Sequence, residues 1–439
     1  MPETPQLPFS LPPPAGGRVD VLIVAGEHSG DEHAARLVCE LRARQPELQI
    51  CALGGPKLAA AGAQLLWDLT AFSVVGFVEV LRHFGFYRTL FGATLAWIGR
   101  HRPRAVCFVD YPGFNLRLAR ALHARGLTAK GGGKIRALYY ISPQIWAWKA
   151  GRRFEMARHL DALAVIFPFE VKSYADTPLP VEFVGHPFVA GDYRSPVRHD
   201  PAGPVLLLPG SRRQAVARIF PALLAGYGWY RQQGGDRGAV VIHPSEEVAA
   251  VLRSELTRWP HLAGKIDLHE VIDGRARADN VTAAASGRWG GSLRVDDKQG
   301  GAGPPGPPDQ NGRPGGPPLS HGVAASAVLT SSGTMSMHCA LAGIPGAIAY
   351  RTSPLTYAFG CWLVKVPYIG IANLLLDEPM YPEFIQGAAT PANLGRELTA
   401  CLDDPARRRR CEEQARRLRA RLHQPGSGTA ADWLVRQLA

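Results

Sequence analysis

Two long apolar runs without polar alternation stand out along the chain, and each stops at a glycine turn before a helical pattern begins. The first run starts at Val19 and ends at Gly26, and the second is 205–208, followed by Gly210. Unbroken apolar runs are typical of strands that are buried on both faces, as in a parallel sheet. The two strand–turn–helix units lie roughly 180 residues apart, which is about one domain each. The pattern therefore predicts two α/β domains.

The rest of the chain repeats the alternation of strand and helix. Further strands are expected at 106–109, 137–141, 162–167, 239–242, 327–329 and 347–350. A charged helix is expected at 405–422 and an amphipathic one at 430–438. Sheets of this kind carry their ligands at the carboxyl ends of their strands. We therefore expect two Rossmann-type parallel-sheet domains that face a cleft, followed by a C-terminal helical tail.

Changes in composition predict where the domains begin and end. Residues 1–18 are Pro-rich and lack the charged start and apolar centre of a signal peptide, so they are interpreted as a disordered tail. An N-terminal domain is expected over 19–190 and a C-terminal domain over 204–422. The linker 191–203 is rich in Asp, Pro and Arg, and a last helix is expected within 423–439.

One stretch interrupts the second domain. Residues 277–322 are rich in Gly, Pro and Asp, without a sustained three-residue period that would indicate collagen. Such a composition cannot bury enough apolar surface to offset its chain entropy. The stretch is interpreted as a low-complexity insertion without structure, or as an artefact of the sequence such as a local frame error.

Composition narrows the class of partner. The chain has 439 residues, of which 46% are hydrophobic, which is enough for two cores. Its net charge of +12 favours anionic partners such as phosphorylated substrates or an acidic membrane surface. No basic block or RNA-binding signature is present, so nucleic acid is not expected. Seven scattered cysteines without a CxxC pair indicate reduced thiols in a cytosolic chain and no zinc site.

The segment 81–97 mixes aromatic, aliphatic and Arg residues. No apolar run in the chain reaches the ~20 residues that a membrane-spanning helix needs. The segment has two interpretations that do not exclude each other. It can form a buried helix, or it can dip into acyl chains while its arginines meet lipid phosphates.

Two turns of the second domain are candidate anion sites. Gly210 permits a tight turn, Ser211 can cap the following helix, and the helix start with Arg212 favours a phosphate. The alternative is an ordinary turn with a solvated arginine. Ser332, Gly333 and Thr334 follow another strand and open a helix, which makes a similar cradle. In the first domain, Ser29 and Glu32 fit a capping box, and the glycine spacing there is not that of a dinucleotide site.

Asp110 is the candidate catalytic residue. It directly follows the strand 106–109, with Asn115 five residues on. A carboxylate at such an edge can accept a proton from a substrate hydroxyl. The alternative is that Asp110 only caps the following helix. The sequence contains no convincing metal-binding set and no Ser/His/Asp arrangement.

These motifs together resemble one family, the lipid-A-disaccharide synthases, which are glycosyltransferases of the GT-B fold. The resemblance covers nearly everything from Val19 to Leu438 except the insertion. The matching segments are 25–31, 54–58, 75–81, 110–118, 139–148, 167–170, 184–187, 207–212, 332–334, 350–357, 363–368, 373–374 and 383–386.

The resemblance implies an inverting transfer of 2,3-diacylglucosamine from UDP to the 6-hydroxyl of 2,3-diacylglucosamine 1-phosphate, without a cofactor or metal. Asp110 matches the family's base. Gly210, Ser211, Arg212, Ser332, Gly333, Thr334 and His338 are expected on the donor side, and Glu27, Ser29 and Asn115 on the acceptor side. The expected location is cytoplasmic, on the inner face of the cytoplasmic membrane, with an anionic membrane surface as partner and a homodimer left open.

Two positions depart from the family pattern. His338 stands where a glutamate suited to ribose hydroxyls is usual, and Gly113 stands where the Asp110 motif usually has a second acid. An imidazole can bind a hydroxyl but cannot supply two anionic oxygens. Three alternatives therefore stay open: a diverged enzyme using another UDP-sugar, a non-catalytic lipid- or nucleotide-binding descendant, and a basic nucleic-acid-binding protein favoured by charge alone.

Overall fold

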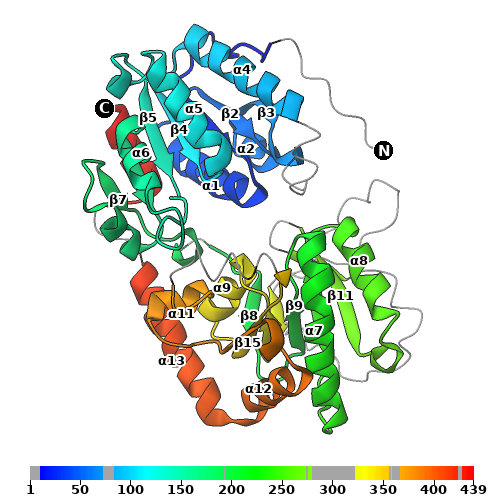
Figure 1. Ribbon diagram of the computed structural model, residues 1–439. Coiled ribbons are helices and arrows are strands. Elements are labelled where there is room, and N and C mark those ends of the chain that lie inside the picture. The colour runs from blue at the N-terminus through cyan, green and yellow to red at the C-terminus, as the bar shows by residue number, and fades with distance from the viewer. Residues whose placement is uncertain are drawn as a thin grey trace, which may run out of the picture. The chain divides into compact units, whose positions relative to one another are not determined.

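The computed structural model describes residues 10–72, 84–191, 193–272, 275–278, 322–354, 357, 366–423 and 428–439. The chain divides into two compact units (Figure 1). The first contains Met1–Gly191 together with Leu422–Ala439, and the second contains Asp192–Arg421. Each unit is an α/β fold built on its own sheet, as the apolar runs predict.

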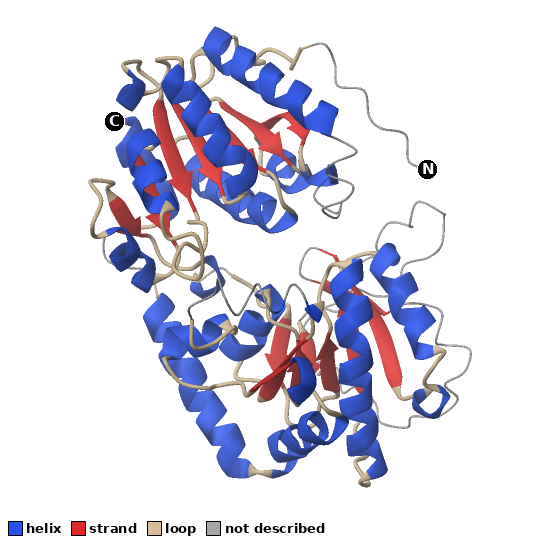
Figure 2. Ribbon diagram, viewed as in Figure 1, coloured by secondary structure: helices blue, strands red, loops and turns tan. Residues whose placement is uncertain are grey.

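The first unit is a seven-stranded sheet whose strand pairs are all parallel, in the order β3-β2-β1-β4-β5-β6-β7 (Figure 2). Its strands are β1 (Val21–Ala25), β2 (Ile50–Gly54), β3 (Gln64–Asp68), β4 (Ala105–Val109), β5 (Arg136–Tyr140), β6 (Ala162–Val165) and β7 (Val181–Phe183). Its helices are α1 (His28–Arg44), α2 (Pro56–Ala60), α4 (Phe84–His101), α5 (Pro112–Ala124), α6 (Arg152–His159) and α14 (Ala430–Leu438).

Helices cover both faces of this sheet. α1 contacts β1, β2 and β4, and α14 contacts α1, β5 and β6, so these two helices share a face. On the other face, α5 lies between α4 and α6. Every residue of β1, β2 and β4 is buried, which confirms the interpretation of unbroken apolar runs as two-sided strands.

The prediction of a disordered tail over 1–18 is wrong for its described part, residues 10–18. Leu11 is buried in the core of the first unit, and the indole of Trp97 donates a hydrogen bond to the Pro12 carbonyl at 2.8 Å. The Gln64 side chain bonds to this segment as well, donating to Pro13 at 2.9 Å and accepting from Ala15 at 2.7 Å. One apolar anchor and long-range hydrogen bonds order a segment whose composition alone favours disorder.

The last helix, α14, belongs to the first unit. Arg44 of α1 forms an ion pair with Asp432 at 2.7 Å, and Arg436 forms one with Glu182 at 2.5 Å. Trp433 and Leu434 are buried. The prediction of a C-terminal helix is confirmed, and its apolar face packs on the domain that begins the chain.

The second unit has a sheet in the order β12-β11-β10-β9-β14-β15-β16, parallel except for the antiparallel pair β11 and β12. Its strands are β9 (Val205–Leu208), β10 (Ala239–His243), β11 (Ile266–Ile272), β12 (Arg275–Ala278), β14 (Ala327–Thr330), β15 (Gly346–Tyr350) and β16 (Glu383–Ile385). Its helices are α7 (Arg213–Gln232), α8 (Glu246–Leu256), α9 (Thr334–Leu341), α11 (Ile371–Leu376), α12 (Pro391–Asp403) and α13 (Pro405–Leu422), the last residue of α13 belonging to the first unit.

Two predicted boundaries change. The linker 191–203 contains a strand, β8 (Val197–His199), which pairs in parallel with β13 (Val323–Ala325). The low-complexity stretch 277–322 begins inside β12, and its residues 279–321 lie outside the described residues. β12 contains neither Gly nor Pro, and β13 begins directly after the stretch, so the strands frame the Gly- and Pro-rich part.

The described part of the segment 81–97 is the helix α4. Leu90, Leu95 and Trp97 are buried in the core of the first unit. Phe91 packs edge-on against Phe114 with ring centroids 5.6 Å apart. The interpretation as a buried helix is confirmed here, and residues 81–83 lie outside the described residues. No helix of the described residues is long and apolar enough to cross a membrane.

Candidate active site

Asp110 lies at the carboxyl end of β4, in a sharp turn. Asp110 and Tyr111 both have left-handed backbones, with φ of 45° and 50°, which is costly for residues other than glycine. The helix α5 begins at Pro112 with Tyr111 as its N-cap residue, and no side chain caps it. Tyr111, and not Asp110, therefore holds the N-cap position, which corrects the interpretation of Asp110 as the helix cap; the Asp110 carboxylate accepts a hydrogen bond from the neighbouring backbone N–H of Tyr111.

Asn115 holds this turn in place. Its side-chain amide is fully buried and donates to the carbonyl of Asp110 at 2.7 Å, and it also reaches Val24 at 3.2 Å and Val109 at 3.3 Å. The hydroxyl of Tyr139 donates to the same Asp110 carbonyl at 2.6 Å. Asn115, expected on the acceptor side, lies beside Asp110, and because its amide nitrogen binds the ends of β1 and β4 it positions Asp110.

The environment of Asp110 makes it a better base than an ordinary aspartate. Burial and, to a smaller extent, the charge of Glu27 raise its pKa to about 6, against the lowering effect of the hydrogen bond from the Tyr111 backbone N–H. With that pKa the group is roughly nine-tenths ionised at neutral pH and still binds a proton more readily than a free carboxylate. Asp110 therefore combines position and pKa for proton abstraction.

Glu27 lies beside Asp110 because β1 and β4 are neighbours in the sheet. It is the N-cap residue of α1, so its acidic side chain stands at the positive end of that helix. Gly26 before it is required by close packing, since a Cβ there would lie 2.1 Å from the ring of Tyr111. Ser29 is exposed inside the first turn of α1.

The predicted capping box of Ser29 and Glu32 is wrong. The helix α1 begins at His28 and no side chain caps it, while Glu32 pairs with Lys57 at 3.0 Å. The acidic residue with a structural role here is Asp31, which is 1% exposed. It accepts hydrogen bonds from the backbone N–H groups of Gly55, Lys57 and Leu58 at 2.8 to 3.2 Å and so caps α2. The sequence feature that could have revealed this role is the position of Asp31, a charged residue on the apolar face of α1.

Glu170 is a buried acid that sequence reasoning missed. It is 2% exposed and accepts hydrogen bonds from the Trp146 indole at 3.3 Å and the Phe167 backbone at 3.2 Å. Burial raises its pKa to about 8, and the charge of Asp110 contributes. Glu170 therefore joins the loop after β5 to the end of β6 at the edge where Asp110 lies. The sequence showed it only as the acid of the segment 167–170.

In the second unit, the two predicted anion cradles lie side by side. β9 and β14 are paired, and the backbone N–H of Ser331 donates to the Leu208 carbonyl at 2.8 Å. Gly210 has a φ of 117°, which a side chain would strain, and Arg212 after it is exposed. The predicted Ser211 cap is wrong, because Arg212 is the N-cap residue of α7 and no side chain caps that helix.

The second cradle is the start of α9. Gly333 is its N-cap residue, and Ser336 accepts from the Gly333 N–H at 3.3 Å and donates to its carbonyl at 2.6 Å. Gly333 and Thr334 are exposed and Ser332 is half-buried. The starts of α7 and α9 thus meet at one edge of the sheet, where their dipoles add to the charge of Arg212.

His338 lies in the second turn of α9 and is only 4% exposed. Its ring stacks on Tyr193 with centroids 5.7 Å apart and an interplanar angle of 6°, and its Nε2 lies 3.3 Å from the tyrosine hydroxyl. The structure therefore keeps His338 in the packed interior and leaves Ser332, Gly333 and Thr334 at the surface of the turn.

Glu383 and Gln386, both in segments that carried the resemblance, hold loops. Glu383 accepts from the backbone of Ile369 and Gly370 at 2.9 Å and from Asn373 at 2.8 Å, at the start of α11. The Gln386 side chain bonds both the N–H and the carbonyl of Thr352. Gln386 therefore fixes the chain that follows β15 and β16, at the carboxyl edge of the sheet, whereas Glu383, the first residue of β16, holds the start of α11.

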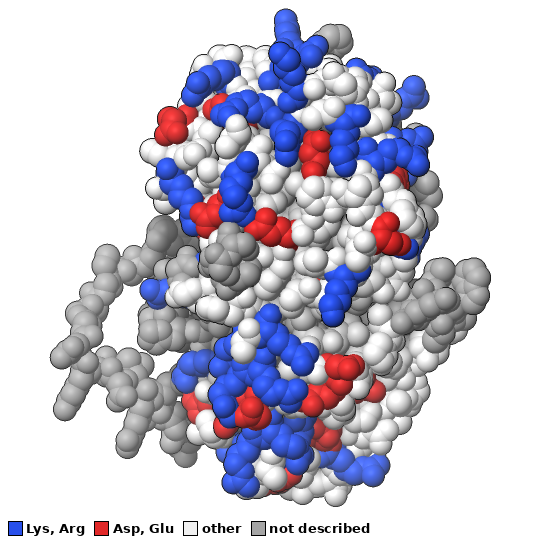
Figure 3. Space-filling view, turned by 90° about the vertical axis from the view of Figure 1, so that its left-hand side faces the viewer, with Lys and Arg blue, Asp and Glu red and all other residues white. Residues whose placement is uncertain are grey.

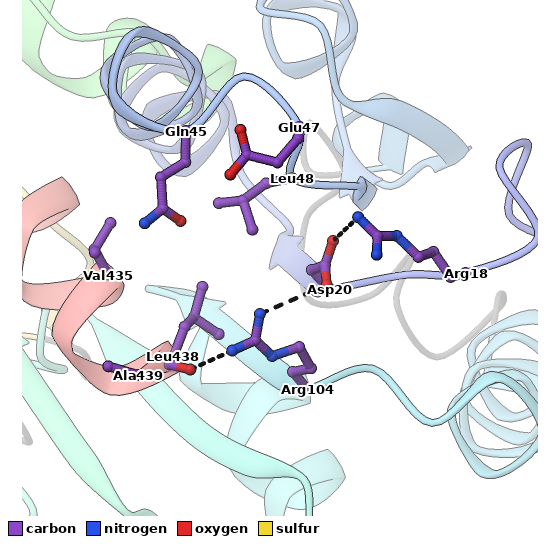
Figure 4. Close-up of a pocket in the computed structure, with 9 residues that line it drawn as sticks. All are labelled: Arg18, Asp20, Gln45, Glu47, Leu48, Arg104, Val435, Leu438 and Ala439. Atoms are coloured by element: carbon purple, nitrogen blue, oxygen red, sulfur yellow. Dashed lines mark hydrogen bonds and ion pairs between the residues drawn. The ribbon is translucent and has the colours of Figure 1, made fainter.

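A pocket of about 290 Å³ lies at the opposite edge of the first sheet (Figure 4). Asp20 and Arg104 line it at the amino ends of β1 and β4, and their side chains are 3.7 Å apart. Arg104 also binds the Leu438 carbonyl of α14. Because ligands of such sheets bind at the carboxyl ends, this pocket is distinct from the Asp110 edge. In the part of the chain that the structure describes, no cluster of His, Cys, Asp or Glu could hold a metal ion.

Comparison with known proteins identifies the family. The model of the lipid-A-disaccharide synthetase family matches residues 21–234 and 319–437. A lipid-A-disaccharide synthase from Geobacter metallireducens is 34% identical over 94% of this chain and 94% of its own length. Lipid-A-disaccharide synthase 1 of Legionella pneumophila strain Philadelphia 1 is 34% identical over 92% of this chain and 93% of its own length.

Solved structures agree on the fold. The UDP-GlcNAc 2-epimerase of Neisseria meningitidis, bound to UDP-GlcNAc, has a TM-score of 0.53 at 11% identity and covers 96% of this chain and 99% of its own. The calicheamicin glycosyltransferase CalG4 has a TM-score of 0.50 at 15% identity and covers 96% and 98%. The fold is that of the GT-B glycosyltransferases, as predicted.

The chain belongs to the lipid-A-disaccharide synthase family and is a glycosyltransferase of lipid A biosynthesis.

Proposed function

From this family membership, we propose that the enzyme transfers 2,3-diacylglucosamine from UDP to the 6-hydroxyl of 2,3-diacylglucosamine 1-phosphate. The products are the lipid A disaccharide 1-phosphate and UDP. The observation that carries the proposal is Asp110, a carboxylate with a pKa raised to about 6 at the end of β4. Tyr111 and not Asp110 is the N-cap residue of α5, and the Asp110 backbone is fixed by Asn115 and Tyr139.

In the proposed mechanism, Asp110 removes the proton of the acceptor 6-hydroxyl as that oxygen attacks the anomeric carbon of the donor. The attack inverts the anomeric centre while the bond to the UDP phosphate breaks. General-base assistance of this kind contributes ~10²–10⁴-fold to a rate. Glu27, whose charge raises the pKa of Asp110, lies on the acceptor side, and we place Ser29 beside it.

The second unit would hold the leaving diphosphate. Arg212 and the paired starts of α7 and α9 present positive charge at one sheet edge. They take up the charge that develops on UDP as the glycosidic bond breaks, which lowers the barrier more than binding of the neutral portions can. Gly210, Ser211, Ser332, Gly333 and Thr334 supply the backbone around the phosphates.

The substrates that we propose carry acyl chains and belong to a lipid bilayer. We therefore place the enzyme in the cytoplasm, on the inner face of the cytoplasmic membrane, with an anionic lipid surface as partner. The net charge of +12 supports that placement.

The test is an assay with purified protein, both glucosamine lipids and a detergent, in which formation of the disaccharide and release of UDP are measured together. Equal amounts of both products support the proposal. UDP release without disaccharide, or neither product, would contradict it.

A second candidate is a diverged enzyme that uses another UDP-sugar, and His338 favours it. A buried imidazole stands at the position where the family usually has a glutamate. A panel of UDP-sugars at equal concentration separates the two candidates. A rate with UDP-2,3-diacylglucosamine that exceeds all others supports the first, and a higher rate with a donor lacking acyl chains supports the second.

A further inference from the structure

The surface segment 148–154, between β5 and the first turn of α6, exposes two large apolar side chains. Trp148 is 40% exposed and Phe154 is 49% exposed. Among the described residues only one other large apolar side chain, Tyr357, is exposed. Two of these three side chains lie within seven residues of each other, and a local concentration of exposed apolar surface is typical of an interaction site.

Cations lie directly on these rings. The ammonium of Lys149 is 4.4 Å from the centre of the Trp148 ring, and the guanidinium of Arg152 is 5.2 Å from it. Arg153 lies 4.2 Å from the Phe154 ring and pairs with Asp176 at 2.6 Å. Lys149 and Arg152 form no ion pair with any described residue. Their charges are therefore available to an anionic partner.

The residues next to the segment 148–154 are held in place by hydrogen bonds and packing. The indole of Trp146, two residues before it, donates to buried Glu170 and packs edge-on against Phe169 with centroids 5.3 Å apart. Nearby, the hydroxyls of Ser142 and Tyr174 are 2.6 Å apart and buried. Since β4 and β5 are neighbours, the segment begins at the same sheet edge as Asp110.

The helix α4 offers no comparable surface among its described side chains. Leu90, Leu95, Trp97 and Ile98 are buried in the core, and Phe86 packs against Trp67 with centroids 6.2 Å apart. The helix α13 is the other strongly basic element, and its arginines are largely used within the second unit. Arg417 pairs with Glu378 at 2.8 Å, for example. On the side shown in Figure 3, acidic side chains lie among the basic ones.

We propose that the segment 148–154 binds the headgroup region of an anionic lipid bilayer. Aromatic rings of this kind favour the boundary between headgroups and acyl chains, and Lys and Arg beside them favour lipid phosphates. The inference rests on the proposed function and deepens it, because it names the surface that would bring a lipid acceptor to the Asp110 edge.

The experiment is co-sedimentation of the full chain with phosphatidylcholine vesicles, with and without roughly one-third phosphatidylglycerol. Wild type should bind the anionic vesicles more tightly, and less so at high salt. A single cation near the surface contributes about five-fold to partitioning, so Lys149→Ser with Arg152→Gln should weaken binding about 25-fold. The control pair Arg409→Gln and Arg410→Gln on α13, where both arginines are exposed, makes the same change in charge and should leave binding nearly unchanged.

A second readout tests insertion of the ring itself. Brominated acyl chains quench an indole that reaches the headgroup boundary, and Trp148→Phe should remove most of the quenching seen with wild type while the melting temperature stays the same. This substitution keeps an aromatic ring, so a loss of quenching reports position and not unfolding.

Three results would overturn the proposal. They are unchanged vesicle binding by Lys149→Ser with Arg152→Gln, equal binding of wild type to neutral vesicles, and displacement by millimolar inorganic phosphate, which would indicate a single phosphate subsite in place of a lipid surface. The detergent assay described above is independent of vesicles. If the enzyme is fully active in the detergent assay and the variants bind vesicles as wild type does, only the proposed lipid surface is refuted. If the wild-type enzyme is inactive in the detergent assay, the proposed function is refuted.

Discussion

The two sheets have similar strand orders, but their carboxyl edges have opposite chemistry. At the first edge lie Asp110, Glu27 and Glu170. Burial raises the pKa values of Asp110 and Glu170, and the charge of Glu27 adds to the shift of Asp110 while the charge of Asp110 adds to that of Glu170. At the second edge, two helix starts and exposed Arg212 present positive charge. Similar sheets can therefore present opposite charges at their carboxyl edges, because the residues that follow each strand differ. In the proposed function, the acidic edge serves the acceptor and the basic edge serves the donor.

The largest effect is expected from Asp110→Asn, which removes the base and keeps the shape. Turnover should fall ~10²–10⁴-fold, because general-base assistance is lost. Binding of UDP, measured by calorimetry, should stay within about two-fold, since the second unit is unaltered. A variant that retains more than about half of wild-type activity would remove Asp110 from the mechanism.

Arg212→Ala should produce the complementary result. A charge-assisted contact to a diphosphate is worth ~1.5–3 kcal/mol, so UDP should bind roughly 10- to 100-fold more weakly. The matched control is Arg213→Ala, the next exposed arginine at the start of α7. Unchanged UDP affinity in the Arg212 variant would contradict the assignment of the second edge to the donor.

Glu170→Gln tests whether burial at the first edge raises the pKa of this carboxyl group. The raised pKa of about 8 means that the folded protein holds a proton that the unfolded chain releases above its ordinary value near 4.5. The contribution of Glu170 to wild-type stability is therefore complete below that value and is lost as the pH rises towards 8. From pH 6 to 7 the loss should be on the order of 1 kcal/mol.

Denaturant unfolding at several pH values measures this effect. The Gln variant cannot lose the proton, so its stability should be flatter over the same window. Parallel curves for both proteins would show that Glu170 is not held neutral by the fold.

The smallest effect, on stability, is expected from deleting the insertion, which lies away in the sequence from the residues discussed at both edges. The interpretation of 277–322 as a low-complexity insertion predicts that deletion of 279–321, with a short helical join between β12 and β13, leaves a folded enzyme. A shorter loop changes the closure entropy by only about 1 kcal/mol. Thermal melts and limited proteolysis check this. A melting temperature lower by ten degrees or more, on the ~2–4 °C per kcal/mol scale, would mean that the segment packs onto the core.

The sequence predicted the strands well because buried parallel strands are continuous apolar runs, and each of the expected runs became a strand. It failed at the helix starts. Ser29 and Ser211 have the right side chains for caps, but the helices begin one residue before Ser29 and two residues after Ser211, and backbone angles decide where a helix begins. It also left the docking of α14 open, because the ion pair of Arg44 and Asp432 joins residues 388 positions apart.

The site was predicted only in part, because local sequence patterns do not show long-range contacts. Asp110 follows its strand directly, so its place could be inferred. The role of Asn115 could not, because its amide reaches Val24 across the sheet, 91 residues away. The raised pKa of Glu170 could not be predicted either, because it results from burial by other parts of the fold, which a short motif does not reveal.

The pH dependence of kcat/KM tests the central claim, that Asp110 is the base at the first edge, most directly. We predict an acidic limb with an apparent pKa of about 6, with activity lost as the pH falls through it because Asp110 is then protonated. In Glu27→Gln the limb should move to lower pH, since the charge that raises the pKa of Asp110 is gone. A rate that does not change between pH 5 and 8, or a limb that Glu27→Gln leaves in place, would contradict the account.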